Sequence, residues 1–136
     1  MTPALIDTDI LSELIKLRNA VVTRHALAYT QQIGPLAFSA VTRYEIIRGF
    51  KQQNATTQLT RFGVFCGNSI ILPLDEPTFD RASDLWAFAR TNGHSANDAD
   101  LLIAATALQH QRVLVTGNTR HFAWVPGLTT IDWRIP

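Results

Sequence analysis

The sequence predicts an α/β fold that consists of a parallel central sheet of about five strands with helices on both faces. Short apolar segments alternate along the chain with longer segments whose apolar residues follow a helical spacing. The short segments are continuously apolar, which is typical of strands that are buried on both faces. No repeat, low-complexity tract or polar linker divides the 136 residues, so we expect a single domain over residues 1–136.

The first part of the chain predicts one strand and two helices. Residues 3–7 contain the apolar run ALI and end in a carboxylate, which indicates a short strand. Residues 9–17 carry their apolar side chains at helical spacing. A second helix is expected over residues 20–32, because Gly34 and Pro35 then stop it.

The middle of the chain repeats this alternation. The run LAFSAV at residues 36–41 predicts the second strand, and residues 42–52 continue as a helix with apolar positions at helical spacing. Another helix is expected over residues 55–66. The third strand is the run SIILPL at residues 69–74.

The last part of the chain predicts two helices and two strands. A helix is expected over residues 76–90, and the segment TNGHSAN breaks it. The most regular helical pattern covers residues 98–110. The run RVLVT at residues 112–116 predicts the fourth strand, and residues 128–133 form a final short strand.

The composition favours a reducing compartment and gives no indication of a binding partner. The lone Cys66 cannot form an internal disulfide, and its apolar neighbours indicate a buried thiol. The N-terminus lacks the pattern of a signal peptide, and no apolar run is long enough to span a membrane, so we expect a cytoplasmic protein without a membrane partner. The formal charge is only +1, from 12 basic and 11 acidic residues, and therefore gives no electrostatic indication of nucleic-acid binding.

Three acidic residues are the candidates for catalysis. Asp7 ends the first predicted strand, Glu45 lies in the first turn of the helix after the second strand, and Asp100 lies in the first turn of the helix before the fourth. If the first strand is central, all three converge at the carboxyl edge of the sheet, where α/β proteins bind ligands. Carboxylates this close repel unless a cation compensates, and a hard divalent ion such as magnesium is the natural choice.

A structural role is the alternative for each acid. Residues 42–45 have the spacing of a helix capping box, and Asp100 stands at the corresponding third position after Asn97. Acids in a first helical turn also interact favourably with the helix dipole. Asp7 at a strand end could hydrogen-bond turn amides.

The residues resemble the PIN-domain nucleases, and within them the VapC-type toxins of bacterial toxin–antitoxin pairs. The resemblance covers nearly the whole chain and rests on five motifs in order. They are LIDTDIL (5–11), SAVTRYEIIRG (39–49), DADLLIAATAL (98–108), LVTGNTRHF (114–122) and VPGLTTIDW (125–133). Each motif is weak alone, but five in this order and spacing make a specific match.

The resemblance implies an endoribonuclease that hydrolyses RNA phosphodiester bonds with Mg²⁺, for which Mn²⁺ substitutes. It implies that Asp7, Glu45 and Asp100 are metal ligands. Asn118 falls where many relatives have a fourth acid; it is kept as a catalytic residue that orients a water, although the missing charge argues against a firmly held second ion. The expected partners are the RNA substrate, a cognate antitoxin and a second copy in a homodimer. The sequence identifies neither the RNA nor the antitoxin.

Several neighbouring residues keep two interpretations. Asp9 either caps the first helix or supports the site, and Asp98 either caps a helix or acts as an outer acid. Thr116 either fixes the turn before Asn118 or is an ordinary strand residue. Arg48 and Arg120 contact RNA or are surface residues, the three tryptophans are core or interface anchors, and His94 and His121 have no carboxylate partner that spacing can assign.

Two other functions compete with the nuclease. A phosphoacceptor signalling domain would use Asp7 and Asp75, but it needs a late basic residue, normally Lys, and the chain has no Lys after Lys51. A degenerate PIN domain would bind RNA or protein as a scaffold without cleavage. The three acids argue against the scaffold, whereas Asn118 leaves room for it.

Overall fold

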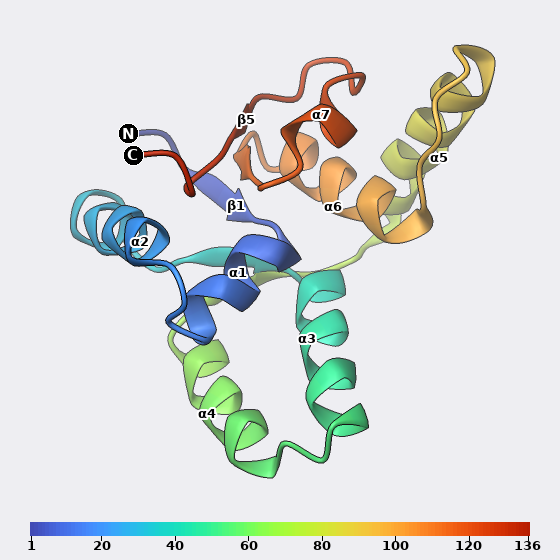
Figure 1. Cartoon of the computed structure of the whole chain (residues 1–136). Helices are drawn as coiled ribbons and strands as arrows, with labels where there is room; N and C mark the ends of the chain where they lie inside the picture. The colour runs from blue at the N-terminus through green and yellow to red at the C-terminus, as the bar shows by residue number, and fades with distance from the viewer.

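The computed structural model describes all 136 residues and has the predicted alternation of strands and helices (Figure 1). Every predicted strand and helix is present, with ends that differ by a few residues. The elements are β1 (Ala4–Ile6), α1 (Thr8–Ile15), α2 (Ala20–Gln32), β2 (Ala37–Ser39), α3 (Ala40–Gln52), α4 (Thr56–Gly67), β3 (Ile70–Leu72), α5 (Glu76–Thr91), α6 (Asp98–Gln109), β4 (Val113–Val115), α7 (Thr119–Phe122) and β5 (Thr130–Ile131). The single-turn helix α7 was not predicted, because four residues are too few to show a helical period.

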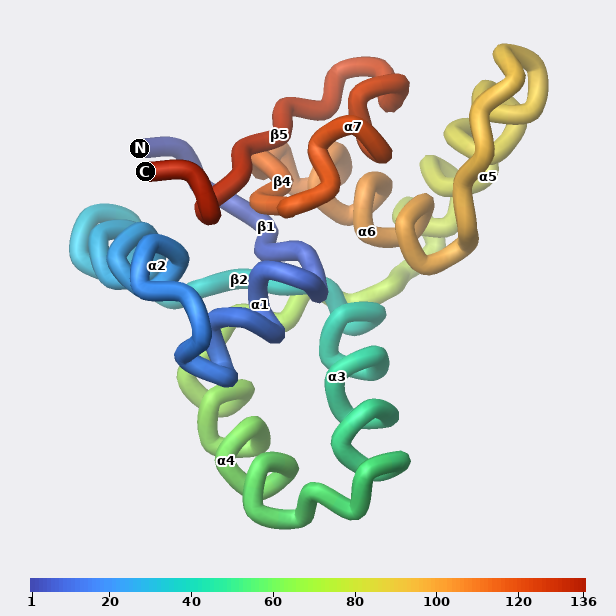
Figure 2. The backbone as a smooth tube through the Cα atoms, in the orientation of Figure 1, coloured from blue at the N-terminus to red at the C-terminus, as the bar shows by residue number.

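The strands form two hydrogen-bonded groups in place of one continuous sheet. The first group has the order β1-β4-β5 and the second the order β2-β3, and all paired strands are parallel. β1 and β2 are neighbours in space, as the traces in Figure 2 show. Two side chains bind the β1 backbone: the Tyr29 hydroxyl accepts from the Ala4 amide at 3.0 Å, and Arg112 Nη1 donates to the Ala4 carbonyl at 3.1 Å. The Ala4 amide and carbonyl thus have hydrogen-bond partners in place of a neighbouring strand.

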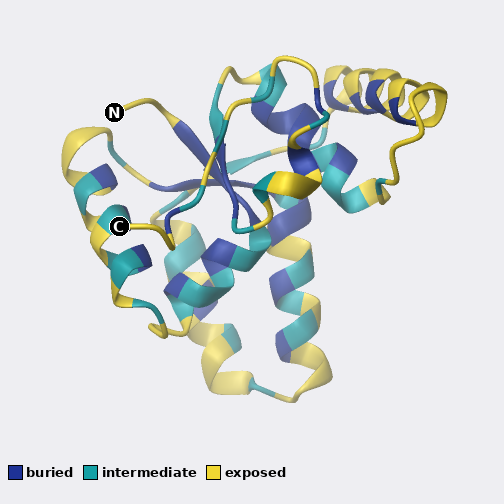
Figure 3. Cartoon of the chain, turned by 45° about the horizontal axis from the view of Figure 1, so that its top comes forward, coloured by how far each residue is buried: buried dark blue, intermediate teal, exposed yellow.

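Hydrophobic cores lie on both faces of the strands, as the sequence predicted. Ala4 and Ile6 belong to a core shared with α1, α2, α3 and α4. Leu5 and Leu114 point to the opposite core, which α5, α6 and the segment around α7 complete. In Figure 3 β1 and β2 are accordingly buried along their length, whereas β3 and β5 are partly exposed. Successive strand residues face opposite sides, so both helical layers depend on the same three-residue strands.

No helix in the structure is both long and apolar enough to cross a membrane.

The carboxyl ends of three strands bring polar residues together. Asp7 directly follows β1, Ser39 ends β2 and Thr116 directly follows β4. The Asp7 amide donates to the Val115 carbonyl at 2.8 Å and extends the β1–β4 ladder to this edge. The polar residues of the candidate site therefore start from a fixed backbone.

Candidate active site

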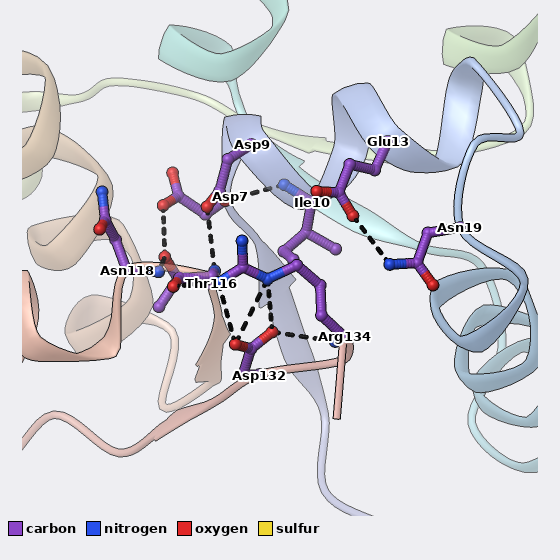
Figure 4. A network of polar contacts seen from close by, with 10 residues as sticks. Asp7, Asp9, Ile10, Glu13, Asn19, Thr116, Asn118, Asp132 and Arg134 are labelled. Atoms are coloured by element: carbon purple, nitrogen blue, oxygen red, sulfur yellow. Dashed lines mark hydrogen bonds and ion pairs between the residues drawn. The ribbon is translucent and has the colours of Figure 1, made fainter. Parts of the chain in front are cut away.

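Asp7 occupies the centre of this edge and is nearly buried. Its side chain is in the N-cap position of α1 and accepts from the Thr8 amide at 2.8 Å. The other carboxylate oxygen accepts from the Thr116 hydroxyl at 2.8 Å (Figure 4). Asp7 is 6% exposed, and Thr116 is completely buried. Thr116 thus fixes the orientation of Asp7 from the neighbouring strand.

The pKa of Asp7 is raised from 3.8 to about 6, and burial is the largest cause. The negative charge of Asp9 also raises the pKa, and that of Asp100 does so to a smaller extent. The hydrogen bonds from Thr116 and Thr8 act in the opposite direction, since they favour the ionised form. A nearby cation would stabilise the ionised form of a carboxylate in this setting.

Asp9 supports the turn after β4 and does not cap α1, so its expected capping role was wrong. Its carboxylate accepts from the Ile10 amide at 2.7 Å and from the Gly117 amide at 3.0 Å. Burial raises the pKa of Asp9, and these amides and Arg134 lower it. A Cβ at Gly117 would collide with the end of the Arg134 side chain and would lie 2.7 Å from the Asp9 carboxylate, so a larger residue here would displace these two side chains.

Glu45 lies in the second turn of α3, and its predicted place in the first turn was wrong. The helix begins at Ala40, and Ser39 is its cap, which accepts from the Val41 amide at 3.1 Å. Thr42 is therefore inside the helix, and the capping-box alternative for Glu45 does not apply. The misplacement arose because the sequence does not show where the β2 residues stop and the helix begins.

The Glu45 carboxylate is tied to the residue next to Asp7. It accepts from the Thr8 hydroxyl at 2.7 Å, and the Thr8 and Thr42 hydroxyls are 3.0 Å apart. Arg48 Nη2 lies 3.7 Å from the second Glu45 oxygen. Thr8 thus links the β1 end to α3, a role that sequence reasoning missed, because a hydroxyl at this position carries no motif of its own.

Asp100 contacts a histidine that the sequence left without a partner. Asn97 is the N-cap of α6, and its side chain accepts from the Asp100 amide at 2.8 Å. Neither Asp98 nor the Asp100 carboxylate therefore caps this helix. His121 Nε2 lies 2.7 Å from Asp100 Oδ2. The pairing could not be foreseen, because His121 is carried by the unpredicted helix α7.

Asn118 is connected to Asp7 through Thr116. Its backbone amide donates to the Thr116 hydroxyl at 3.0 Å, and the same hydroxyl donates to Asp7. The Asn118 side chain makes no capping hydrogen bond to α7. Figure 4 shows Asn118 beside Thr116 and Asp7.

The donor chemistry of this edge fits a hard divalent cation, although the side chains do not form a closed ligand set. No three His, Cys, Asp or Glu side chains lie close enough together to hold a metal ion. Magnesium commonly uses only one or two carboxylates and completes its shell with water and substrate phosphate. Asp7 with its raised pKa and Asp100 close enough to influence it meet that requirement.

Comparisons with known proteins give consistent matches over nearly the whole chain. The model of the PIN domain family matches residues 4–128. The chain is 29% identical over 134 residues to the tRNA(fMet)-specific endonuclease VapC of Shigella flexneri, which covers 98% of this chain and 99% of that protein. It is 31% identical over 118 residues to ribonuclease VapC10 of Mycobacterium tuberculosis, which covers 87% and 84%. A toxin–antitoxin complex from Klebsiella pneumoniae contains a chain with a TM-score of 0.74 and 26% identity, covering 96% of this chain and 97% of that one.

We predict that, without metal, the stability of Asp7→Asn relative to wild type increases as the pH rises from acid to neutral. The folded-state pKa of Asp7 is raised, so its ionisation reduces wild-type stability as the pH rises from about 4 to about 6. A rise from 3.8 to about 6 corresponds to about 3 kcal/mol. The stability of Asp7→Asn minus that of wild type should increase by up to this amount between pH 4 and pH 8, measured by urea unfolding in excess chelator.

Asp75→Asn is the matched control. The hydrogen bonds from Thr78 and Gln109 lower the pKa of Asp75, so it is ionised in both folded and unfolded protein above about pH 5. Its stability difference from wild type should be constant between pH 5 and pH 8. The same pH-independence for Asp7→Asn would contradict the effect of burial on Asp7.

Proposed function

The chain belongs to the PIN domain family, and we propose that it is the toxin of a toxin–antitoxin pair, a metal-dependent endoribonuclease that hydrolyses RNA phosphodiester bonds. The observation that carries the proposal is the nearly buried Asp7 carboxylate, with its pKa raised to about 6, at the carboxyl edge of the strands. The matched proteins named as an endonuclease and a ribonuclease support the same activity.

The proposed ligands of the divalent ion, Mg²⁺ with Mn²⁺ as a substitute, are Asp7, Glu45 and Asp100, although their three carboxylates do not form a closed set in this structure. When bound, the ion supplies a nucleophile from water at neutral pH and stabilises negative charge on the phosphate. Asp7 is the strongest candidate for direct contact, because it is nearly buried at the end of β1, and Asp100 lies close enough for its charge to raise the pKa of Asp7. Glu45 joins them from α3 through its bond to Thr8.

The remaining residues orient these carboxylates. Thr116 donates to Asp7 and accepts from the Asn118 amide, so one buried hydroxyl sets both positions. His121 holds one oxygen of Asp100 and leaves the other for a cation or a water. As a catalytic residue, Asn118 would orient a water with its side-chain amide.

The partners follow from the same assignment. The complex from Klebsiella pneumoniae is a toxin–antitoxin complex, and we assign this chain a cognate antitoxin that covers the acidic edge. A homodimer and a cytoplasmic location complete the proposal, since an endoribonuclease toxin acts where cellular RNA is found.

A scaffold that binds RNA or protein without cleavage is the second candidate. Asn118 in place of an acid and the absence of a closed three-ligand set favour it. Cleavage by the purified protein separates the two functions.

We predict that the purified protein cleaves cellular RNA with Mg²⁺ or Mn²⁺ and stops when the ion is chelated. The reason is that the proposed nucleophile is a water activated by the bound ion. RNA fragments would be followed by gel electrophoresis before and after excess chelator, with Asp7→Asn as the control for contaminating nuclease. Cleavage that persists in excess chelator would refute the mechanism. No cleavage either with the ion or in chelator would favour the scaffold.

We predict that Glu45→Gln abolishes cleavage without disturbing the fold. The Gln carbonyl can still accept from Thr8, so the metal-free melting temperature should change little. Loss of the charge should reduce the cleavage rate at least about 100-fold, because the reacting groups lose their alignment. Glu76→Gln, an exposed change on α5, is the control and should cleave normally. A near-normal rate for Glu45→Gln would remove Glu45 from the site.

A further inference from the structure

Three aromatic side chains lie together near the ends of α5 and α7. The Phe88, His94 and Trp124 rings are nearly parallel, with interplanar angles of 10° to 14°. Their centroids form a triangle with sides of 6.5 Å, 6.2 Å and 5.2 Å. In a column of three rings the outer two would be about twice as far apart as neighbours, so these rings form a patch and not a column.

Helix termination explains only part of this patch. Gly93 adopts a φ of +71°, and the His94 amide donates to the Ala89 carbonyl at 2.8 Å, which is the bond of a Schellman motif at the end of α5. A contact between His94 and Phe88 usually accompanies such a motif. Trp124 comes from the segment after α7 and has no part in the termination of α5, yet its ring is the closest to His94.

The patch is accessible and adjoins the candidate active site. His94 is exposed, Phe88 is 39% exposed and Trp124 is half-buried. Trp124, His121 and Asp100 line the same small hollow. In Figure 2 the chain after α5 leads into the start of α6, and α7 lies beside α6. A chain that crosses Asp100 therefore passes next to Trp124.

We propose that His94 and Trp124 form a stacking subsite for one nucleobase of the substrate RNA, next to the bond that is cleaved. The inference rests on the proposed function and adds the part of the site that binds a base. Protein binds single-stranded RNA by stacking unpaired bases on aromatic rings, and parallel rings at the surface suit a flat ligand. The Schellman motif holds His94 in place before RNA binds, which reduces the entropy lost on binding.

The test compares two RNA probes that differ only in their bases. One is a fluorescein-labelled decamer of adenosine, and the other is a decamer of abasic ribose phosphates. Binding is measured by fluorescence anisotropy in excess chelator, so neither probe should be cleaved. Both probes carry the same phosphates, so repulsion from the acidic residues cancels in the ratio of their dissociation constants.

Wild type should bind the adenosine decamer about 10-fold more tightly than the abasic one. His94→Ala and Trp124→Ala should lose most of this preference, and Trp124→Phe should retain most of it because it keeps a ring. Trp86→Ala is the matched control, since Trp86 is half-exposed on α5, stacks with Arg90 and lines a different hollow from Trp124. Its preference should equal that of wild type.

Equal binding of the two probes by wild type would overturn the proposal and leave the rings as a surface for a protein partner. An unchanged preference in His94→Ala and in folded Trp124→Ala would also overturn it; if Trp124→Ala does not fold, His94→Ala decides. The ratio is measured without cleavage and therefore fails independently of the nuclease activity. A protein that cleaves RNA but shows no preference refutes only the subsite, and one that shows the preference but never cleaves refutes only the nuclease.

Discussion

Burial of a carboxylate is costly unless hydrogen bonds or an opposite charge compensate it, and this constraint governs the arrangement around Asp7. Asp7 is the one acidic or basic side chain among the buried residues. The Thr116 hydroxyl and the Thr8 amide stabilise its ionised form, but the pKa is still raised to about 6. A cation at the end of β1 would therefore stabilise the ionised form of Asp7.

The same contacts connect the site to the whole fold. Thr116 lies after β4, whereas Thr8 carries the connection from β1 to Glu45 on α3. Asp100 approaches from α6 on the opposite core and is held by His121 of α7. Because both helical layers pack on the same short strands, the acids from the two layers reach one edge without a long loop.

The fold and the place of Asp7 at the end of a strand could be predicted from the sequence, but the local contacts of the acids could not. Continuous apolar runs are enough to identify short strands buried on both faces, and the position of Asp7 at a strand end follows from them. The start of α3 was misplaced because Ser39 and Thr42 are both acceptable helix caps, and only the backbone decides between them. The division between β1 and β2 depends on the Tyr29 hydroxyl, and the His121–Asp100 contact depends on a single-turn helix; neither leaves a periodic pattern in the sequence.

We propose that Asp7 and Asp100 together hold a divalent cation at this edge. Anomalous diffraction from crystals of the protein soaked in Mn²⁺ tests this claim most directly, because the anomalous signal locates the ion independently of any assay. We predict a peak within coordinating distance of an Asp7 carboxylate oxygen and an Asp100 carboxylate oxygen. A fully occupied manganese ion elsewhere, with no peak between these two carboxylates, would contradict it.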